Sequence, residues 1–445
     1  MRLDHWQALC LIPLALWILI SGLDDLWITL VSVYLGYRRT LPTDETSREC
    51  PPERPIAIFV PLWHEHGVIG RMLERNLSVI RYKNYQVFAG VYPNDPETRR
   101  AVAAAAQRHP RVQPVLCAND GPTSKGDCLN WIYRGMEEYE RLHGMRFEVV
   151  VTHDAEDLIH PDSLAIISRL SREYQMVQIP VLPLPTGLGE LTHGLYCDEF
   201  AEYQSKDIPV RQFLGGFVPS NGVGTGFERD ALERLAAERG QVFDPACLTE
   251  DYENGYRLHA LGCRQIFVQL RFDEAVLAAT REYFPRTMGR AIRQRSRWVA
   301  GIVLQGWQFH GWRVPRSQIY WFWRDRKGLI GNLLSPFANL FLLAGINAGP
   351  SSVPVWTLRI CLLNLAISMI QAGVRFRHAQ RIYGWRFGSG VPIRICWGNV
   401  VNFCATAAAI VQFTTARLRG RNLAWRKTEH VYPSLQEESA LSVSE

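Results

Sequence analysis

Hydrophobic and polar positions divide the chain into two apolar ends and a mixed middle. Residues 1–39 and 329–417 are far more apolar than the segment between them. In the middle, short β-branched runs alternate with stretches whose apolar residues recur every three or four positions. This alternation predicts an α/β domain of the Rossmann kind, with a parallel sheet and right-handed helical crossovers. The predicted strands are 56–62, 86–91, 112–117 and 147–153, and the predicted helices are 69–80, 96–108 and 125–140.

The N-terminal apolar segment predicts one membrane anchor. Residues 6–37 are long enough to cross a bilayer, but Asp24 and Asp25 lie near the middle, where carboxylates are costly in lipid. We therefore expect these acids to face other helices, a polar cavity or the interface, or to mark a bent or re-entrant segment.

The C-terminal apolar region predicts two spans, 329–348 and 355–373, joined by a short turn. A third apolar stretch, 395–415, is followed by the basic segment 417–427. If the third stretch crossed, those basic residues would lie outside, against the positive-inside rule. We therefore expect an interfacial or re-entrant helix there.

Charge and cysteine content narrow the functional classes. A net charge of +6 over 445 residues is too small to argue for a nucleic-acid partner. Basic residues gather instead beside the apolar ends, as in juxtamembrane segments on the cytoplasmic side. The ten cysteines include no CxxC pair, which predicts reduced thiols. The absence of GxGxxG argues against a dinucleotide cofactor.

The stretch Glu148–Asp162, EVVVTHDAEDLIHPD, combines a strand with acids at its carboxyl end. Ligands bind at that edge of open α/β sheets. If the chain stays extended, Asp154 and Glu156 project to the same side and can hold one Mg²⁺ or Mn²⁺ together with a substrate diphosphate. An equally weighted alternative is that Asp157 or Asp162 caps the next helix.

Four motifs, taken in order, resemble the membrane-anchored family 2 glycosyltransferases, which include cellulose and hyaluronan synthases. The motifs are VPLWHEHGVIGRML at 60–73, DAED at 154–157, TED at 249–251 and QRSRW at 294–298. Further stretches look closer to the phage adsorption protein B group of inner-membrane enzymes: DLWITL near the start, WRDRKGLIGNLL at 323–334 and WRKTEHVYP at 425–433. The resemblance implies a GT-A fold and a bacterial inner-membrane location. In that group an outer-envelope partner is thought to export a polysaccharide.

Three residues are candidates for binding the donor nucleotide. Glu65 and Asp95 follow the first two predicted strands, where carboxylates can accept from a base N–H, and the resemblance implies uracil recognition. The rival for Asp95 is a helix cap, because YPNDPET is also a good turn. Lys125 precedes a helix N-terminus, where a cation and free N–H groups suit a diphosphate. A plain surface lysine is equally consistent with the sequence.

The TED motif supplies the predicted catalytic acids, Glu250 and Asp251. Asp251 is the expected general base, taking the proton from an acceptor hydroxyl. The alternative is that Thr249 or Asp251 only caps a helix. A glycine-rich turn at 220–227 could bring its backbone close to the acceptor through Gly224 and Thr225, or be a plain connection.

In QRSRW, Gln294, Arg297 and Trp298 share one helix face by their spacing. Gln294 and Arg297 are predicted to hold the donor, Arg297 by bidentate contact with its diphosphate, and Trp298 to stack on an acceptor sugar. The rival is an amphipathic helix on the membrane, which explains the arginines but not the glutamine with the tryptophan.

These expectations together describe a metal-dependent, inverting transferase that moves sugar from a nucleotide diphosphate donor, UDP above all, to a growing glycan for export. The alternatives are a single transfer to a lipid-linked acceptor, or a non-catalytic secretion or phage-receptor scaffold. Membrane lipid and an outer-envelope export partner are the other expected partners. The predicted domains are an anchor at 1–39, a linker at 40–55, a GT-A domain at 56–301, interfacial helices at 302–328, membrane helices at 329–417 and a tail at 418–445.

Overall fold

The computed structural model describes residues 3–38, 52–270, 272, 277–347, 354–420, 423 and 432, which form two compact units. The sheet unit comprises Asp44–Leu184, Gly215–Tyr283 and Arg419–Glu445, and the helical unit comprises Met1–Thr43, Pro185–Leu214 and Phe284–Leu418. The domain predicted over 56–301 is therefore divided, because 185–214 and 284–301 belong to the helical unit. Most of the predicted linker and the tail beyond Pro433 lie outside the described residues.

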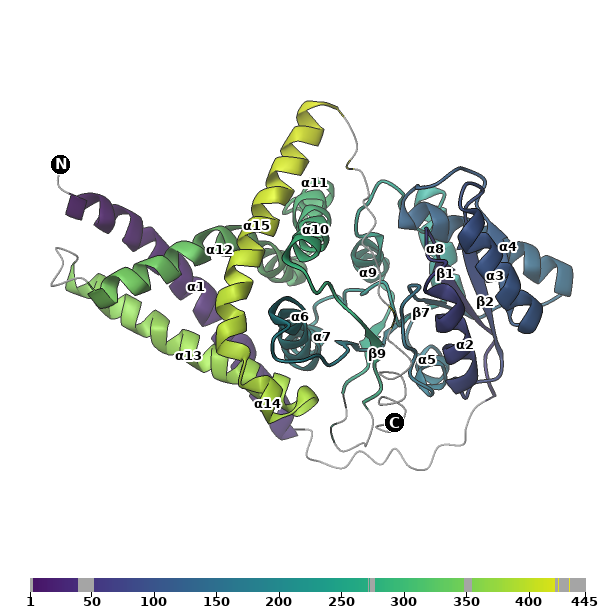
Figure 1. Cartoon of the computed structure of the whole chain (residues 1–445), viewed down its shortest axis with the longest axis horizontal. Coiled ribbons are helices and arrows are strands. Elements are labelled where there is room, and N and C mark those ends of the chain that lie inside the picture. Colours follow the sequence, from purple (N-terminus) through teal and green to yellow (C-terminus); the bar gives the residue numbers. More distant parts are fainter. Residues whose placement is uncertain are drawn as a thin grey trace. The chain divides into compact units, whose positions relative to one another are not determined.

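A seven-stranded sheet with the order β3-β2-β1-β4-β7-β5-β8 organises the sheet unit (Figure 1). The four predicted strands form β1 to β4 and are parallel. Strand β7 runs antiparallel to both neighbours, so the sheet is mixed, and β6 pairs separately with β9. The strands are β1 (Ile56–Pro61), β2 (Tyr85–Val91), β3 (Val112–Leu116), β4 (Val149–Thr152), β5 (Met176–Gln178), β6 (Val181–Pro183), β7 (Thr225–Glu228), β8 (Gln265–Phe267) and β9 (Thr280–Glu282).

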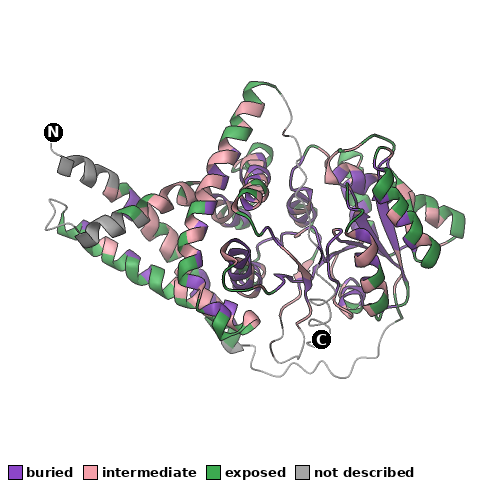
Figure 2. Cartoon of the chain, viewed as in Figure 1, coloured by how far each residue is buried: buried purple, intermediate pink, exposed green. Residues whose placement is uncertain are grey.

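The core of this unit covers both faces of the central strands (Figure 2). In β1, neighbouring residues point to opposite faces, yet Ile58 and Phe59 are both buried, as expected for a parallel strand with layers on each side. The predicted helices appear within a few residues of their expected bounds. The helices of this unit are α2 (Ile69–Val79), α3 (Pro96–Arg108), α4 (Lys125–His143), α5 (Ser163–Leu170), α8 (Arg229–Arg239) and α9 (Glu250–Ala260).

Strand register brings the predicted acids to one edge of the sheet. Ile58 of β1 pairs with Val87 of β2 and Val151 of β4, all in parallel. Because the carboxyl ends of parallel neighbours lie at the same edge, the segments that follow β1, β2 and β4 leave the sheet side by side.

The helical unit contains long apolar helices and a shorter set between them. Helix α1 is continuous through Asp24 and Asp25, so the segment is not re-entrant. Both acids face α12, where Lys327 Nζ lies 2.7 Å from Asp24 and 2.8 Å from Asp25. The helices are α1 (Leu3–Arg38), α6 (Leu191–Glu202), η1 (Tyr203–Asp207), α7 (Ile208–Phe213), α10 (Met288–Trp298), η2 (Val299–Gln305), α11 (Gly306–His310), α12 (Arg316–Asn347), α13 (Val355–Tyr383), α14 (Trp385–Gly388) and α15 (Val391–Leu418).

Ion pairs join these helices in what we call the polar layer. In it, acids of α1, α6 and η1 meet bases of α10, α12, α13 and α15. For example, Arg394 of α15 contacts both oxygens of Asp198 at 2.6 and 2.8 Å, and Arg375 of α13 lies 2.7 Å from Glu202. The layer comprises Asp24, Asp25, Asp198, Glu199, Glu202 and Asp207 with Arg295, Arg324, Lys327, Arg375 and Arg394.

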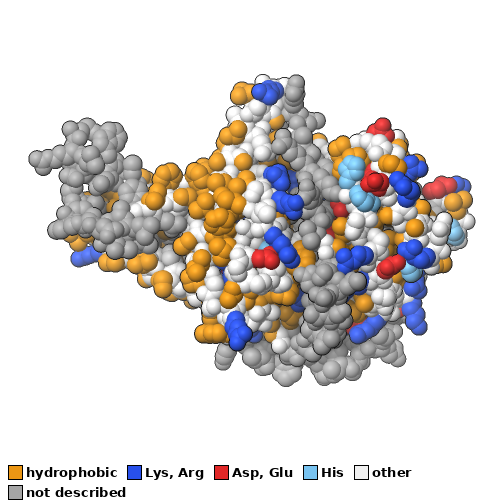
Figure 3. Space-filling model, in the orientation of Figure 1, with side chains coloured by type: hydrophobic (Ala, Val, Ile, Leu, Met, Phe, Trp, Pro, Cys, Tyr) orange, Lys and Arg blue, Asp and Glu red, His pale blue; other side chains and the backbone are white. Residues whose placement is uncertain are grey.

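Three helical segments are long and apolar enough to cross a membrane among the residues that the structure describes: Leu11–Gly36, Val355–Tyr383 and Val391–Leu418. The predicted span 329–348 lies in α12 and is not among these three. Helix α15 is continuous, so the re-entrant alternative for 395–415 is wrong. Hydrophobic side chains gather over the helical unit in Figure 3, whereas charged ones predominate over the sheet unit.

Candidate active site

Asp95 and Glu65 are both buried at the carboxyl edge of the sheet. Asp95 caps α3, because its two oxygens accept from the backbone N–H groups of Thr98 at 3.2 Å and His64 at 2.6 Å. The helix-cap interpretation of Asp95 is therefore confirmed. Recognition of a base by this side chain has to compete with these two backbone hydrogen bonds.

The chain does not stay extended after β4. Strand β4 ends at Thr152, and residues 155–156 form a turn, so strand alternation does not bring Asp154 and Glu156 to one side. Asp154 is partly exposed, whereas Glu156 is buried. The turn forms because Asp157, rather than capping a helix, accepts the backbone N–H of Asp154 at 3.0 Å.

The cap alternative for this segment is not supported at either acid. Asp157 is fully buried, and its Oδ2 lies 2.7 Å from Nδ1 of His153. Asp162 occupies the N-cap position of α5 but makes no side-chain cap hydrogen bond. The DAED turn is thus held by its own internal contacts, which leave Asp154 as its outward-facing acid.

Lys125 lies at the centre of the acidic edge. Ser124 caps α4 and accepts the N–H of Asp127, which fixes the first turn that carries the lysine. Lys125 Nζ lies 2.6 Å from Asp154 Oδ1, and its side chain is only 16% exposed, so the plain surface-lysine alternative is wrong. Burial alone lowers the pKa of Lys125, but the carboxylates of Asp154, Glu250 and Asp251 raise it above its ordinary value.

The TED acids open α9, and Asp251 faces this lysine. Thr249 makes no side-chain cap hydrogen bond, so the cap alternative fails there. Gly222 makes the approach possible: a Cβ on it would lie 2.6 Å from Asp251 Oδ2 and 3.3 Å from Lys125 Nζ. Its φ of +77° also favours glycine. The sequence indicated a glycine-rich turn but did not single out Gly222.

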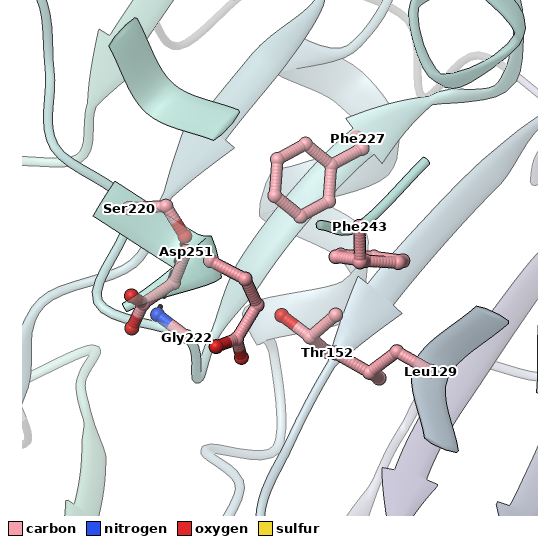
Figure 4. A pocket seen from close by; sticks show the side chains of 8 residues that line it. Leu129, Thr152, Ser220, Gly222, Phe227, Phe243 and Asp251 are labelled. Atoms are coloured by element: carbon pink, nitrogen blue, oxygen red, sulfur yellow. Dashed lines mark hydrogen bonds between the residues drawn. The ribbon is translucent and has the colours of Figure 1, made fainter. Parts of the chain in front are cut away.

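A small pocket lies beside these acids. In Figure 4 the rings of Phe227 and Phe243 lie next to each other, across from Ser220, Gly222 and Asp251. The pocket therefore has apolar walls on one side and carboxylates on the other. It is lined by Leu129, Thr152, Ser220, Gly222, Phe227, Phe243, Glu250 and Asp251.

Asn130 links α4 to the segment that leads into TED. Its side chain donates to the carbonyl of Phe243 at 2.7 Å and accepts the N–H of the same residue at 3.0 Å. Gly126 allows close packing, since a Cβ there would lie 3.1 Å from the carbonyl oxygen of Asp244. These contacts set the spacing between Lys125 and α9. The sequence gives one sign of these contacts: Asn130, a polar residue, lies at a position where the periodicity of the helix predicts a buried side chain.

Gly224 and Thr225 do not form an acceptor surface. Thr225 lies on β7, is fully buried, and donates its hydroxyl to Gln178 Oε1 at 2.7 Å. A Cβ on Gly224 would lie 2.5 Å from Thr280 Oγ1, so internal packing explains this glycine. The acceptor role predicted for both residues is therefore wrong, because the turn ends in a strand of the central sheet.

The QRSRW residues belong to the helical unit. Gln294, Arg297 and Trp298 lie on α10, as predicted. The Trp298 ring packs among aromatic rings, with centroids 6.0 Å from Tyr196 and 6.4 Å from Phe284. This packing holds the indole in place and leaves its role in acceptor stacking a prediction.

A further acid faces the DAED turn from β9. Strand β9 is tied to the turn by backbone hydrogen bonds between Leu158 and Arg281, at 2.8 and 3.1 Å. Burial, together with the charges of Asp157 and Asp154, raises the pKa of Glu282 well above its ordinary value. Burial likewise raises the pKa of Asp157, against the effect of its contact with His153.

The oxygen donors at this edge fit a hard divalent cation. Among the described residues, no three His, Cys, Asp or Glu side chains are placed to hold one ion. Mg²⁺ sites of substrate complexes need only one or two carboxylates, because water and phosphate oxygens complete the shell. Asp154, partly exposed beside Lys125, has the chemistry and the position for such a ligand.

Comparisons with known proteins agree with this geometry. Residues 51–301 match the family model described as glycosyltransferase like family 2. Bacteriophage adsorption protein B of Escherichia coli K12 is 39% identical over 467 residues, which cover 95% of the chain and 62% of that relative. Bacteriophage N4 adsorption protein B of E. coli O157:H7 gives the same values. The chain thus spans about three fifths of the length of these relatives.

A solved structure shares the fold. It is a mannosyltransferase from Pyrobaculum calidifontis in complex with GDP-mannose and Mn²⁺. The TM-score is 0.52 at 17% identity, over 86% of the chain and 99% of that structure. At this identity the likeness supports the GT-A fold and not a shared substrate.

Proposed function

Because the chain belongs to glycosyltransferase-like family 2, we propose that it transfers a sugar, with inversion, from a UDP-sugar to a growing glycan at the bacterial inner membrane. The observation that carries this proposal is the placement of Lys125 among Asp154, Glu250 and Asp251. The reaction needs a site for the donor diphosphate and a base for the acceptor hydroxyl. Lys125 suits the diphosphate, and the carboxylates around it include a candidate base.

The donor diphosphate binds at the N-terminus of α4. Lys125 and the positive end of the α4 helix dipole attract its charge, and Glu65 lies at the same edge for the base. Asp154, with Glu156, would hold Mg²⁺ or Mn²⁺. When bound, the ion offsets the negative charge that develops on the leaving diphosphate. Gln294 and Arg297 are proposed to contact the donor, and Trp298 the acceptor sugar.

Asp251 is the proposed general base. Its carboxylate accepts the proton of the acceptor hydroxyl as that oxygen attacks the anomeric carbon on the face opposite the diphosphate. Such catalysis supplies about 10²–10⁴-fold in rate. Lys125 supplies a positive charge beside Asp251, since the two side chains lie close enough for Asp251 to raise the pKa of Lys125. Glu250 adds a second negative charge beside Lys125.

The polymeric product and its export are part of the proposal. The apolar helices of the helical unit support a reaction at a membrane, and we propose that the product is passed outward. The E. coli relatives are named for phage adsorption, which supports a partner in the outer envelope. A single transfer to a lipid-linked acceptor uses the same residues and is the alternative within this class.

Release of nucleoside diphosphate tests the proposal. The chain, purified in lipid with Mg²⁺ or Mn²⁺, is offered a panel of nucleotide sugars, and we expect release with a UDP-sugar. Asp251→Asn is the matched control, because it keeps the shape of the side chain and removes its basicity. No release with any donor, or equal release from both proteins, would contradict the proposal and favour a non-catalytic scaffold.

A further inference from the structure

Helix α15 presents a line of exposed apolar side chains along its whole length. Ile393, Val400, Val411 and Leu418 are 63, 40, 64 and 83% exposed. At 100° per residue, these positions fall within about 20° of one another, so they form one stripe. We call these four residues the α15 stripe. Arg394, on another side of the helix, is almost fully buried.

Polar contacts hold the first half of α15 against short, charged helices. Arg394 pairs with Asp198 of α6, and Asn402 accepts from Arg295 of α10 at 2.7 Å. Only residues 184–190 separate β6 from α6, a reach of about 25 Å, which is too short to cross a hydrocarbon core of about 30 Å. Helix α6, and with it the start of α15, therefore lies on the same side of the membrane as the sheet unit.

The remainder of α15 is too short to cross. Between Asn402 and Arg417 it has 14 residues, or about 21 Å of helix, against a core of about 30 Å. By length and composition the whole of α15 is long enough to cross a membrane. That length includes the first half of the helix, which polar contacts hold against α6 and α10. If the whole of α15 crossed, the part of the polar layer that holds its first half would lie within the hydrocarbon core, where charged side chains are costly.

The end of the chain gives an independent argument. Tyr432 belongs to the hydrophobic core of the sheet unit and is 7% exposed. The guanidinium of Arg71, on α2, lies 5.0 Å from its ring centre. If α15 crossed the membrane, Tyr432 would be on the opposite side from the core that contains it. Helix α15 must therefore begin and end on one side.

We propose that α15 lies along the membrane surface on the side of the sheet unit, with the α15 stripe bound at the boundary between headgroups and acyl chains. Arg417 and Arg419 flank Leu418, the last residue of the stripe, and suit anionic phosphates. The crossing segments are then 3–23, 328–347 and 355–374, each about 30 Å long and each next to the polar layer. In Figure 1, α15 runs across the direction of α12 and α13, so it does not share their path through the bilayer.

Depth measurements by spin labelling test this arrangement. Single cysteines at the α15 stripe positions, with native cysteines including the exposed Cys396 replaced, are labelled with nitroxide in nanodiscs containing anionic lipid. Oxygen and nickel accessibilities then give the depth of each label. We expect one shallow depth for all four labels. A depth that rises and falls along α15, or labels fully exposed to water, would overturn the proposal.

Helix α13 provides the matched control. Val355, Leu362 and Met369 recur every seven residues, form one stripe, and are 66, 66 and 67% exposed. Labels there should differ in depth by up to about 21 Å, because 14 residues separate the ends of a crossing helix. The comparison distinguishes a surface helix from a crossing helix within one sample.

A second measurement does not depend on label depth or on catalysis. A cysteine appended after Glu445 should resist a membrane-impermeant maleimide in intact cells and react after permeabilisation. One placed before Met1 should react in intact cells, because three crossings put the two ends on opposite sides. Labelling of the C-terminal cysteine in intact cells would refute the surface position of α15 even if the chain proves to be an active transferase.

Discussion

Replacing Gly222 by alanine should separate the general base from its lysine with little other change. The new Cβ would lie 2.6 Å from Asp251 Oδ2, whereas ordinary contact begins at 3.4 Å, so the carboxylate must move by about 0.8 Å. Misplacement of a reacting group by about 1 Å can cost about 10²-fold in rate. We expect Gly222→Ala to lower transfer about 10²-fold while nucleotide affinity stays nearly normal, because the donor is held by other groups.

Backbone strain has to be separated from this displacement. Gly222 has φ of +77°, and an L-residue in that region costs roughly 1–2 kcal/mol of stability. Gly215 has the same φ of +77°, but a Cβ there has no neighbour within 4 Å. Gly215→Ala therefore reproduces the strain without the contact. It should lower stability by the same amount and leave transfer near normal.

The assay measures three quantities on both variants in the same lipid preparation: thermal unfolding, UDP affinity and the initial rate of transfer. Equal stability losses with a rate loss confined to Gly222→Ala support the reasoning. If both variants lose rate equally, strain rather than the position of Asp251 is responsible. Normal transfer by Gly222→Ala would refute the placement of Asp251 as the base.

Four other substitutions test the acids one at a time. Asp251→Asn should bind donor and metal nearly normally and lose about 10²–10⁴-fold in transfer, and near-normal turnover would exclude a general base. Asp154→Asn and Glu156→Gln should weaken Mn²⁺ binding in titrations with nucleotide present, and unchanged affinity in both would show that neither is a ligand. The raised pKa of Glu282 means that the folded chain keeps a proton that the unfolded chain releases above a pH of about 4.3, so stability falls as pH rises. Glu282→Gln should make the melting temperature less dependent on pH above about 4.3, and an unchanged slope would contradict the assignment.

Sequence periodicity predicted the fold well where local signals and packing agree. The bounds of α3 were predicted without error, because Asp95 and Pro96 supply a cap and a fixed φ at its start. The parallel strands β1 to β4 followed from β-branched runs. Strand β7 was missed, because TGFE is too short and glycine-rich to stand out from the turn before it.

The sequence predicted which charged residues form the site. It did not predict the contacts that set the distances between them. Asp154 and Asp251 lie in motifs and Lys125 precedes a predicted helix, but how close these residues lie depends on Gly222 and on Asn130, 92 residues apart in the sequence. The turn after β4 escaped prediction because Asp157 forms it through a buried contact with His153. Such long-range contacts leave no periodic signal in a single sequence.

The polar layer also constrains the order in which the protein is completed during synthesis. Asp198 is made 196 residues before its partner Arg394, and Glu202 is made 173 residues before Arg375. At about 5–20 residues per second, these acids wait roughly 10–40 s for their partners. Glu202 can pair early with Lys206, at 2.5 Å, but until Arg394 is made Asp198 lacks the guanidinium that neutralises it, which should favour a chaperone-bound intermediate. A ribosome that stalls before Arg394 would therefore leave a chain whose helices cannot close around α6, whatever the state of its catalytic residues.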